Sequence, residues 1–80
     1  MQIVWDEKAV KELKKLDLSI QKRILKSIDE LSINPTAKDI KKLIGIEGFR
    51  LRLGDYRVIF QTEHDNLHIL KVGHRKNIYR

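Results

Sequence analysis

The sequence predicts an α+β fold in which a short N-terminal strand and two helices precede three antiparallel strands, in the order β-α-α-β-β-β. Apolar residues recur at three- and four-residue steps between residues 7 and 33, which is the spacing of amphipathic helices. Between residues 48 and 74 apolar and polar residues alternate instead, and a Gly-Asp step divides the alternating runs. Residues 1–80 are therefore expected to form a single domain, with the helices on one face of a mainly antiparallel sheet.

The first half contains the N-terminal strand and both helices. Residues 2–5 predict a short strand, and Asp6 follows as the N-cap of the first helix. The second helix begins at Asp17 or Ser19 and ends at Asn34-Pro35, because the residue before a proline disfavours helical backbone. Since only about two residues link the helices, we expect an antiparallel helical hairpin. The apolar stripe of the second helix consists of Ile20, Ile24, Leu25, Ile28 and Leu31.

The second half contains the other strands. Thr36 and Asp39 resemble a weak capping box, so residues 37–43 are predicted to form one or two helical turns. Gly54-Asp55 joins the next two strands as a type II′ turn, and residues 63–66 join the last two. These three strands are expected at about 48–53, 56–62 and 67–74.

A two-residue loop at Gly54-Asp55 determines how the strands on either side pair. By the same alternation, Leu70 and Val72 of the last strand belong on the apolar side of the sheet, which the helices should cover. The apolar residues of the hairpin face each other on that side in three pairs: Leu53 with Tyr56, Leu51 with Val58, and Phe49 with Phe60.

This register gathers basic residues on the opposite side of the sheet, where Arg52 lies directly opposite Arg57. Such a cluster is destabilised by mutual repulsion unless an anion neutralises it, and arginine suits two-pronged binding of phosphate. Solvated arginines that point away from one another are the alternative interpretation. Gly73 should leave a shallow gap in the middle of this side. The residues that share it are Arg50, Arg52, Arg57, Lys71, Gly73 and, if the last strand continues, Arg75.

The charge distribution favours an acidic partner. Residues 34–80 hold ten of the 17 Lys and Arg residues but only five of the 11 Asp and Glu residues, so they carry most of the net charge of +6. A basic surface fits nucleic acid or an acidic protein segment, although charge also serves solubility. The chain has no apolar run of membrane-spanning length and no signal-peptide layout, which predicts a cytoplasmic protein without a membrane partner.

The residue types limit the chemistry. Cysteine is absent, and the histidines and acidic residues show no metal-ligand spacing, so we expect neither a metal nor a cofactor. RNA cleavage needs neither, because the 2′-hydroxyl can attack the adjacent phosphate while cations stabilise the phosphoryl oxygens and two protons move. The candidates for proton transfer are His74, Lys76 and Tyr79. An end-of-chain aromatic that packs on the sheet is an equal interpretation of Tyr79.

Two segments resemble the RelE/ParE toxin superfamily, on its RelE-like side: KLIGIEGFRLRLGDYRVIF at 42–60 and LKVGHRKNIYR at 70–80. The resemblance implies a toxin of a type II toxin–antitoxin pair, specifically an endoribonuclease that cuts mRNA in the ribosomal A site. Such a toxin works without a metal and leaves a 2′,3′-cyclic phosphate. The resemblance also implies a cognate, RelB-like antitoxin, whose binding segment we expect to be partly acidic and partly amphipathic.

The resemblance also assigns roles to individual residues. The two basic residues of the family's second strand fall on Arg50 and Arg52, which are lysines in the best-known pattern. One of those lysines is thought to act as general base, whereas arginine hardly deprotonates. The base is therefore expected at His74 or, second, at Tyr79. The family's phosphate-contacting arginine falls on Arg57, and its C-terminal arginine and tyrosine fall on Arg75 and Tyr79. Together with the sheet register, this predicts RNA phosphate contacts from Arg50, Arg52, Arg57, Lys71, Arg75 and Lys76.

Two alternatives stay open at this point. ParE-like members of the same fold inhibit DNA gyrase by binding and show no nuclease activity. A relative that binds RNA without cutting it is the other alternative, with Arg50 and Arg52 in place of proton-transferring groups.

Overall fold

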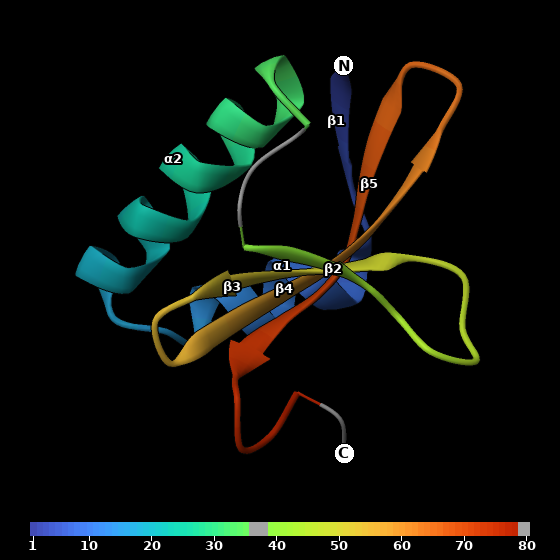
Figure 1. Ribbon diagram of the computed structural model, residues 1–80. Coiled ribbons are helices and arrows are strands. Elements are labelled where there is room, and N and C mark those ends of the chain that lie inside the picture. The colour runs from blue at the N-terminus through green and yellow to red at the C-terminus, as the bar shows by residue number, and fades with distance from the viewer. Residues whose placement is uncertain (36–38, 79–80) are drawn as a thin grey trace.

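The computed structural model describes residues 1–35 and 39–78. A five-stranded sheet with the strand order β1-β5-β4-β3-β2 forms its centre (Figure 1). β1 runs parallel to β5 and every other neighbouring pair is antiparallel, which confirms the predicted α+β class. The elements in chain order are β1 (Gln2–Trp5), α1 (Glu7–Lys14), α2 (Leu18–Ile33), β2 (Ile40–Lys42), β3 (Phe49–Leu53), β4 (Tyr56–Glu63) and β5 (Asn66–His74).

Both helices begin and end near the predicted residues. Asp6 caps α1, because its side chain accepts a hydrogen bond from the amide of Lys8 at 2.9 Å. Asp17 rather than Ser19 is the N-cap of α2, and Asn34 ends that helix in an extended conformation before Pro35. No helix in residues 1–35 and 39–78 is long and apolar enough to cross a membrane.

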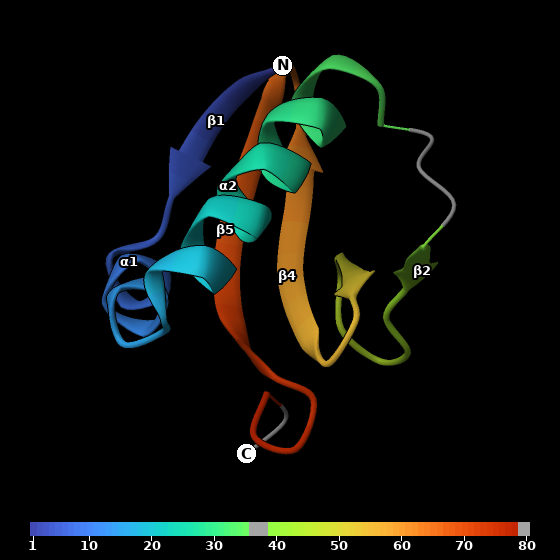
Figure 2. The ribbon, with the colours of Figure 1, turned by 90° about the vertical axis from the view of Figure 1, so that its left-hand side faces the viewer.

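A short link at residues 15–17 joins the two helices, and both pack on one face of the sheet, as predicted. α1 packs against β5, whereas α2 contacts β1 and passes in front of β5 in Figure 2.

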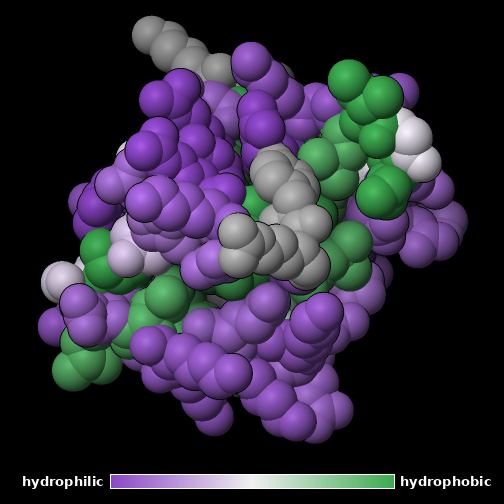
Figure 3. Space-filling view, turned by 90° about the horizontal axis from the view of Figure 1, so that it is seen from below, coloured by the Kyte–Doolittle hydropathy of each residue, from purple (hydrophilic) through white to green (hydrophobic). Residues whose placement is uncertain are grey.

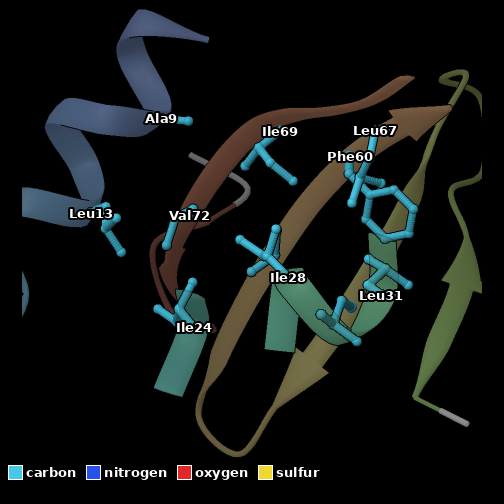
Figure 4. Packing of buried hydrophobic residues seen from close by; sticks show 11 residues of the cluster. Ala9, Leu13, Ile24, Ile28, Leu31, Phe60, Leu67, Ile69 and Val72 are labelled. Carbon is cyan, nitrogen blue, oxygen red and sulfur yellow. The ribbon is translucent and has the colours of Figure 1, made fainter. Parts of the chain in front are cut away.

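The core lies between the helices and the sheet (Figure 4). In α2 the buried residues are Ile24, Ile28 and Leu31, whereas the predicted Leu25 is 41% exposed and lies at the margin of the stripe. The core residues of the other elements are Ala9, Leu13, Leu51, Val58, Phe60, Leu67, Ile69 and Val72. The helices thereby cover one face of the sheet.

The β3–β4 hairpin has the predicted register. Leu53 pairs with Tyr56, and the pairs Leu51–Val58 and Phe49–Phe60 follow in step. Gly54 has a φ of 60°, as the first central residue of a II′ turn requires, and glycine adopts this backbone without strain.

The helical turns predicted at 37–43 are wrong for residues 40–42. These residues form β2, an edge strand whose Lys41 pairs with Arg50 of β3. Residues 37 and 38 lie outside the described residues, as does Thr36 of the expected capping box. A weak local capping signal was outweighed by backbone pairing with β3, which no short window of sequence contains.

The placement of Leu70 on the core face is also wrong. Val72 pairs with Val58 as predicted, but Phe60 pairs with Ile69 and Ile59 with Lys71. This register shift makes Leu70 the extra residue of a β-bulge, so Ile69 enters the core in its place. The bulge returns Lys71 to the face away from the helices.

Candidate nucleic-acid interface

Basic side chains lie in two rows across the sheet face that is turned away from the helices. In one row Arg52 pairs with Arg57, and Arg57 pairs with Gly73. The other row runs across four strands and consists of Lys41, Arg50, Ile59 and Lys71. We call these two rows the basic face. The register of the hairpin therefore brings Arg50, Arg52, Arg57 and Lys71 together as the sequence predicted.

The sequence analysis did not assign Lys41 to the basic face. It lies in β2 directly opposite Arg50 and is exposed. The helical interpretation of residues 37–43 gave it no place on the sheet. An extended reading of Ile40–Lys42 as a fourth antiparallel strand would have found it, because the residue across from Arg50 must share the face of that arginine.

The turn between β3 and β4 holds the guanidinium of Arg57. Its Nη1 donates to the carbonyl oxygens of Gly54 at 2.6 Å and of Tyr56 at 2.8 Å. These bonds orient the guanidinium while leaving the N–H groups of Nε and Nη2 for an anion. Arg57 is therefore oriented by its own hairpin.

Arg75 is not on the strand, because β5 ends at His74. It belongs to the following turn, and it contacts Asp55 twice. Its backbone amide donates to the carbonyl oxygen of Asp55 at 2.7 Å, and its Nε lies 3.6 Å from a carboxylate oxygen of the same residue. The ion pair is exposed and contributes little stability, so the backbone contact determines where Arg75 lies. The Gly54-Asp55 turn thus brings Arg57 and Arg75 to the same end of the sheet.

A further arginine of α2 approaches the same turn. A Cβ atom added at Gly54 would lie 3.5 Å from a terminal guanidinium nitrogen of Arg23. The sequence interpretation did not single out Arg23, because helix periodicity gave no reason to connect it with the hairpin.

The shallow gap predicted at Gly73 is filled. Ile78 is only 3% exposed, and a Cβ atom added at Gly73 would lie 3.4 Å from its Cδ1 atom. The Nζ of Lys71 donates to the carbonyl oxygen of Ile78 at 2.8 Å. Gly73 and Lys71 therefore hold the C-terminal segment against the basic face.

Replacing Gly73 by valine is expected to displace Ile78, because the larger side chain would occupy its position. In the wild type the amide of Ile78 donates to the carbonyl oxygen of His74 at 3.0 Å. Hydrogen exchange of this amide should therefore become at least about tenfold faster in the valine variant. Gly73→Ala is the matched control, because a single methyl group reaches only ordinary contact distance. Equal exchange rates in Gly73→Val and wild type would contradict this packing.

His74 lies on the other face of the sheet. It pairs with Tyr56, whose ring it meets edge-on at a centroid distance of 5.5 Å, and it shares the helix side with Val72. Its Nδ1 accepts a hydrogen bond from the amide of Lys76 at 3.1 Å. A neutral imidazole with this acceptor carries its proton on Nε2 and has no second lone pair for a base. This geometry does not favour His74 as the general base.

The remaining residues of the expected site belong to the C-terminal segment. Lys76 is exposed in the turn after β5, where its backbone amide donates to Nδ1 of His74. Tyr79 lies outside the described residues.

The chain matches the family model described as ParE toxin of type II toxin-antitoxin system, parDE, over residues 3–79. Toxin RelE3 of Methanocaldococcus jannaschii is 36% identical, with 99% of this chain and 96% of the relative covered. The chain belongs to the RelE/ParE toxin superfamily.

Solved structures of RelE/ParE proteins share the fold. The archaeal RelE–RelB complex from Pyrococcus horikoshii OT3 superposes with a TM-score of 0.82 at 31% identity, covering 95% of this chain and 96% of that one. The RelB–RelE antitoxin–toxin complex from Methanococcus jannaschii gives 0.79 at 32% identity, covering 95% and 94%. The sequence resemblance to RelE-like toxins is thereby confirmed, and the protein is a RelE-like toxin of a toxin–antitoxin system.

Proposed function

We propose that this RelE-like toxin is an endoribonuclease that cleaves mRNA in the ribosomal A site, in the cytoplasm. The 2′-hydroxyl of one nucleotide attacks its own 3′-phosphate, the bond to the next nucleotide's 5′-oxygen breaks, and a 2′,3′-cyclic phosphate and a 5′-hydroxyl result. One proton leaves the attacking hydroxyl and one reaches the leaving oxygen. The reaction needs only the side chains of the protein, with no metal or cofactor. The pairing of Arg52 with Arg57, beside Arg50 and Lys71, is the observation that carries this proposal.

The basic face supplies the cations. Arg50, Arg52 and Lys71 would contact the RNA backbone and fix its course over the sheet. We assign the contact with the scissile phosphate to Arg57, because its guanidinium is already oriented by the hairpin turn. Preorganised donors stabilise charge that develops on phosphoryl oxygens without reorganisation during the reaction. Arg75 and Lys76 would contact phosphate from the turn after β5.

Cleavage also requires a group that accepts the proton of the attacking 2′-hydroxyl. The hydrogen bond at Nδ1 and the position on the helix side weigh against His74, which was the first candidate from the sequence. We therefore place Tyr79 first, on the resemblance to the family. Positive charge favours a phenolate, so a tyrosine in this arginine-containing part of the sequence suits a general base.

A translating extract tests the proposal. Incubation with the purified toxin should produce mRNA fragments that end in a 2′,3′-cyclic phosphate, mapped by primer extension and by the resistance of the ends to periodate. A Tyr79→Phe variant should cleave at least about tenfold more slowly if the phenol moves a proton. Intact mRNA at toxin concentrations that arrest growth would refute the nuclease proposal.

A second candidate function rests on the matching family model, which describes a ParE toxin. A ParE-like toxin would bind DNA gyrase and inhibit supercoiling without cutting RNA. The discriminating measurement is supercoiling of relaxed plasmid by gyrase in the presence of the toxin. RNA binding without cleavage or gyrase inhibition would favour the third possibility, a relative that has lost its nuclease activity.

The partner proposal is a RelB-like antitoxin. The solved relatives from Pyrococcus horikoshii and Methanococcus jannaschii are complexes of RelE with RelB. We propose that the antitoxin of this chain is acidic and amphipathic where it binds, because a basic surface is best complemented by carboxylates.

A further inference from the structure

Three exposed aliphatic side chains lie along one side of α2. Leu18 is 72% exposed, Leu25 is 41% exposed and Ile33 is 85% exposed. At 3.6 residues per turn they fall within about 80° of arc, on a side of the helix turned away from the buried Ile24 and Ile28. Seen from below, the surface is mostly hydrophilic and its hydrophobic areas are separate (Figure 3). A row of aliphatic side chains on one helix therefore marks a surface that another molecule covers.

Two charged residues complete this row. Lys22 lies three residues before Leu25, and Asp29 lies four residues after it; both are exposed. Because steps of three and four residues keep side chains on one side of a helix, the charged and aliphatic residues form one continuous stripe. We call it the outer stripe of α2, and it consists of Leu18, Lys22, Leu25, Asp29 and Ile33.

The outer stripe is complementary to itself. From Leu25 outward, each half carries one charged residue and then one aliphatic residue, and the two charges have opposite signs. When two copies of α2 pack antiparallel across a two-fold axis at Leu25, Lys22 of one copy lies opposite Asp29 of the other. Leu18 then lies opposite Ile33. A closed two-fold interface requires this kind of self-complementarity, whereas a parallel arrangement would bring like charges together.

We propose that the outer stripe is the contact between two copies of this toxin, which associate through antiparallel α2 helices as a two-fold dimer. The inference goes beyond the proposed function and does not depend on nuclease activity. The two Leu25 side chains would meet at the centre, and the two pairs of Lys22 with Asp29 would fix the register. An apolar centre with charged residues around it is the usual composition of a protein–protein interface.

The distribution of charge permits this contact. Residues 1–33 hold seven Lys and Arg residues and six Asp and Glu residues, so the helical half of the chain is nearly neutral. Most of the net charge of +6 lies in residues 34–80. α2 covers the sheet face opposite the basic face, and it lies in front of the sheet in Figure 2. The basic faces of the two copies would therefore point away from each other and stay uncovered by the dimer.

The size of the contact predicts a weak dimer. α2 has 16 residues, so it is about 24 Å long. One helix side of this length buries less than the roughly 800 Å² per partner that is typical of a stable interface. We therefore expect a dissociation constant on the order of 0.1 mM. At the low micromolar concentrations of an unfolding experiment, the chain would be monomeric.

Reversal of the two charges tests the proposal by sedimentation equilibrium of the purified toxin, at concentrations on either side of the expected dissociation constant. Lys22→Glu and Asp29→Lys should each weaken association about tenfold, because the two-fold axis places like charges opposite each other twice. The combination Lys22→Glu/Asp29→Lys restores opposite charges across the axis and should return the dissociation constant to within about threefold of wild type. Positions seven residues apart do not contact each other within one helix, so this rescue requires a second copy.

Further variants separate the aliphatic contact from general effects. Leu25→Ser should weaken association at least about tenfold, as for loss of a central interface residue. Ile44→Ser is the matched aliphatic control, because Ile44 is 99% exposed in the loop between β2 and β3. Lys8→Glu in α1 is the matched charge control. Both controls should associate within about twofold of wild type, and circular dichroism checks that every variant is folded.

Several outcomes would overturn the proposal. A monomer at every concentration would do so, as would a dimer that neither charge reversal weakens. Weaker association in both single variants without rescue in the combination would show a general effect of charge rather than this contact. Leu25-dependent binding of the antitoxin encoded beside the toxin, without self-association, would assign the outer stripe to the antitoxin instead. Because association is measured without RNA, failure of the nuclease proposal would leave the result readable.

Discussion

Replacing Arg57 by alanine is expected to slow mRNA cleavage in a translating extract by at least about tenfold. The guanidinium is oriented by the carbonyl oxygens of Gly54 and Tyr56, and its side chain lies opposite Arg52 on the basic face. Removing it takes away a preorganised donor at the developing phosphoryl charge. Single-turnover rates at saturating toxin would separate this effect from weaker binding.

Two further variants separate the loss of the planar guanidinium from the loss of positive charge. Arg57→Lys keeps the charge but loses the planar fork, so its rate should lie between those of wild type and Arg57→Ala. Lys22→Ala removes an exposed positive charge from α2 and should cleave at the wild-type rate. A melting curve for each variant confirms that the fold is retained. Wild-type cleavage by Arg57→Ala would remove Arg57 from the site.

Replacing Ile28 by alanine is expected to lower the free energy of unfolding by about 2–5 kcal/mol. Ile28 is 1% exposed and lies in the middle of α2, where it packs between this helix and the sheet (Figure 4). The change removes buried methyl groups and leaves a cavity that the surrounding side chains fill only in part. Urea unfolding followed by circular dichroism measures the loss as a shift of the midpoint.

Ile33→Ala is the matched control in the same helix. Ile33 is 85% exposed, so its truncation should change stability by less than about 0.5 kcal/mol. If Ile28→Ala were as stable as this control, α2 would not be packed on the sheet as described. A large loss in both variants would instead indicate that Ile33 is buried in solution, for example by a second copy of the chain.

The sequence predicted strand register and helix ends correctly where a single short motif determines them. Gly54-Asp55 alone determined the pairing of β3 with β4, because a two-residue turn leaves one register. Pro35 determined where α2 ends, and Asp6 where α1 begins. The Gly54-Asp55 turn also places Arg52 directly opposite Arg57. Much of the basic face could therefore be predicted without coordinates.

The errors share a different cause, which is that pairing between distant segments overrides local preference. β2 exists because it pairs with β3, although residues 37–43 carry a capping signal. The bulge at Leu70 is a property of two strands together, so periodicity in one strand could not reveal it. The first feature determines the position of Lys41 on the basic face, and the second brings Ile69 instead of Leu70 into the core.

For the site, the sequence by itself determined which residues are basic and which face of the hairpin they share. The tertiary structure decided how those residues are held. It placed Arg75 on the carbonyl oxygen of Asp55, filled the gap at Gly73 with Ile78, and turned His74 toward the helices. The physical reason is that alternation along a strand is set locally, whereas the course of the chain after a strand ends depends on the contacts that it meets.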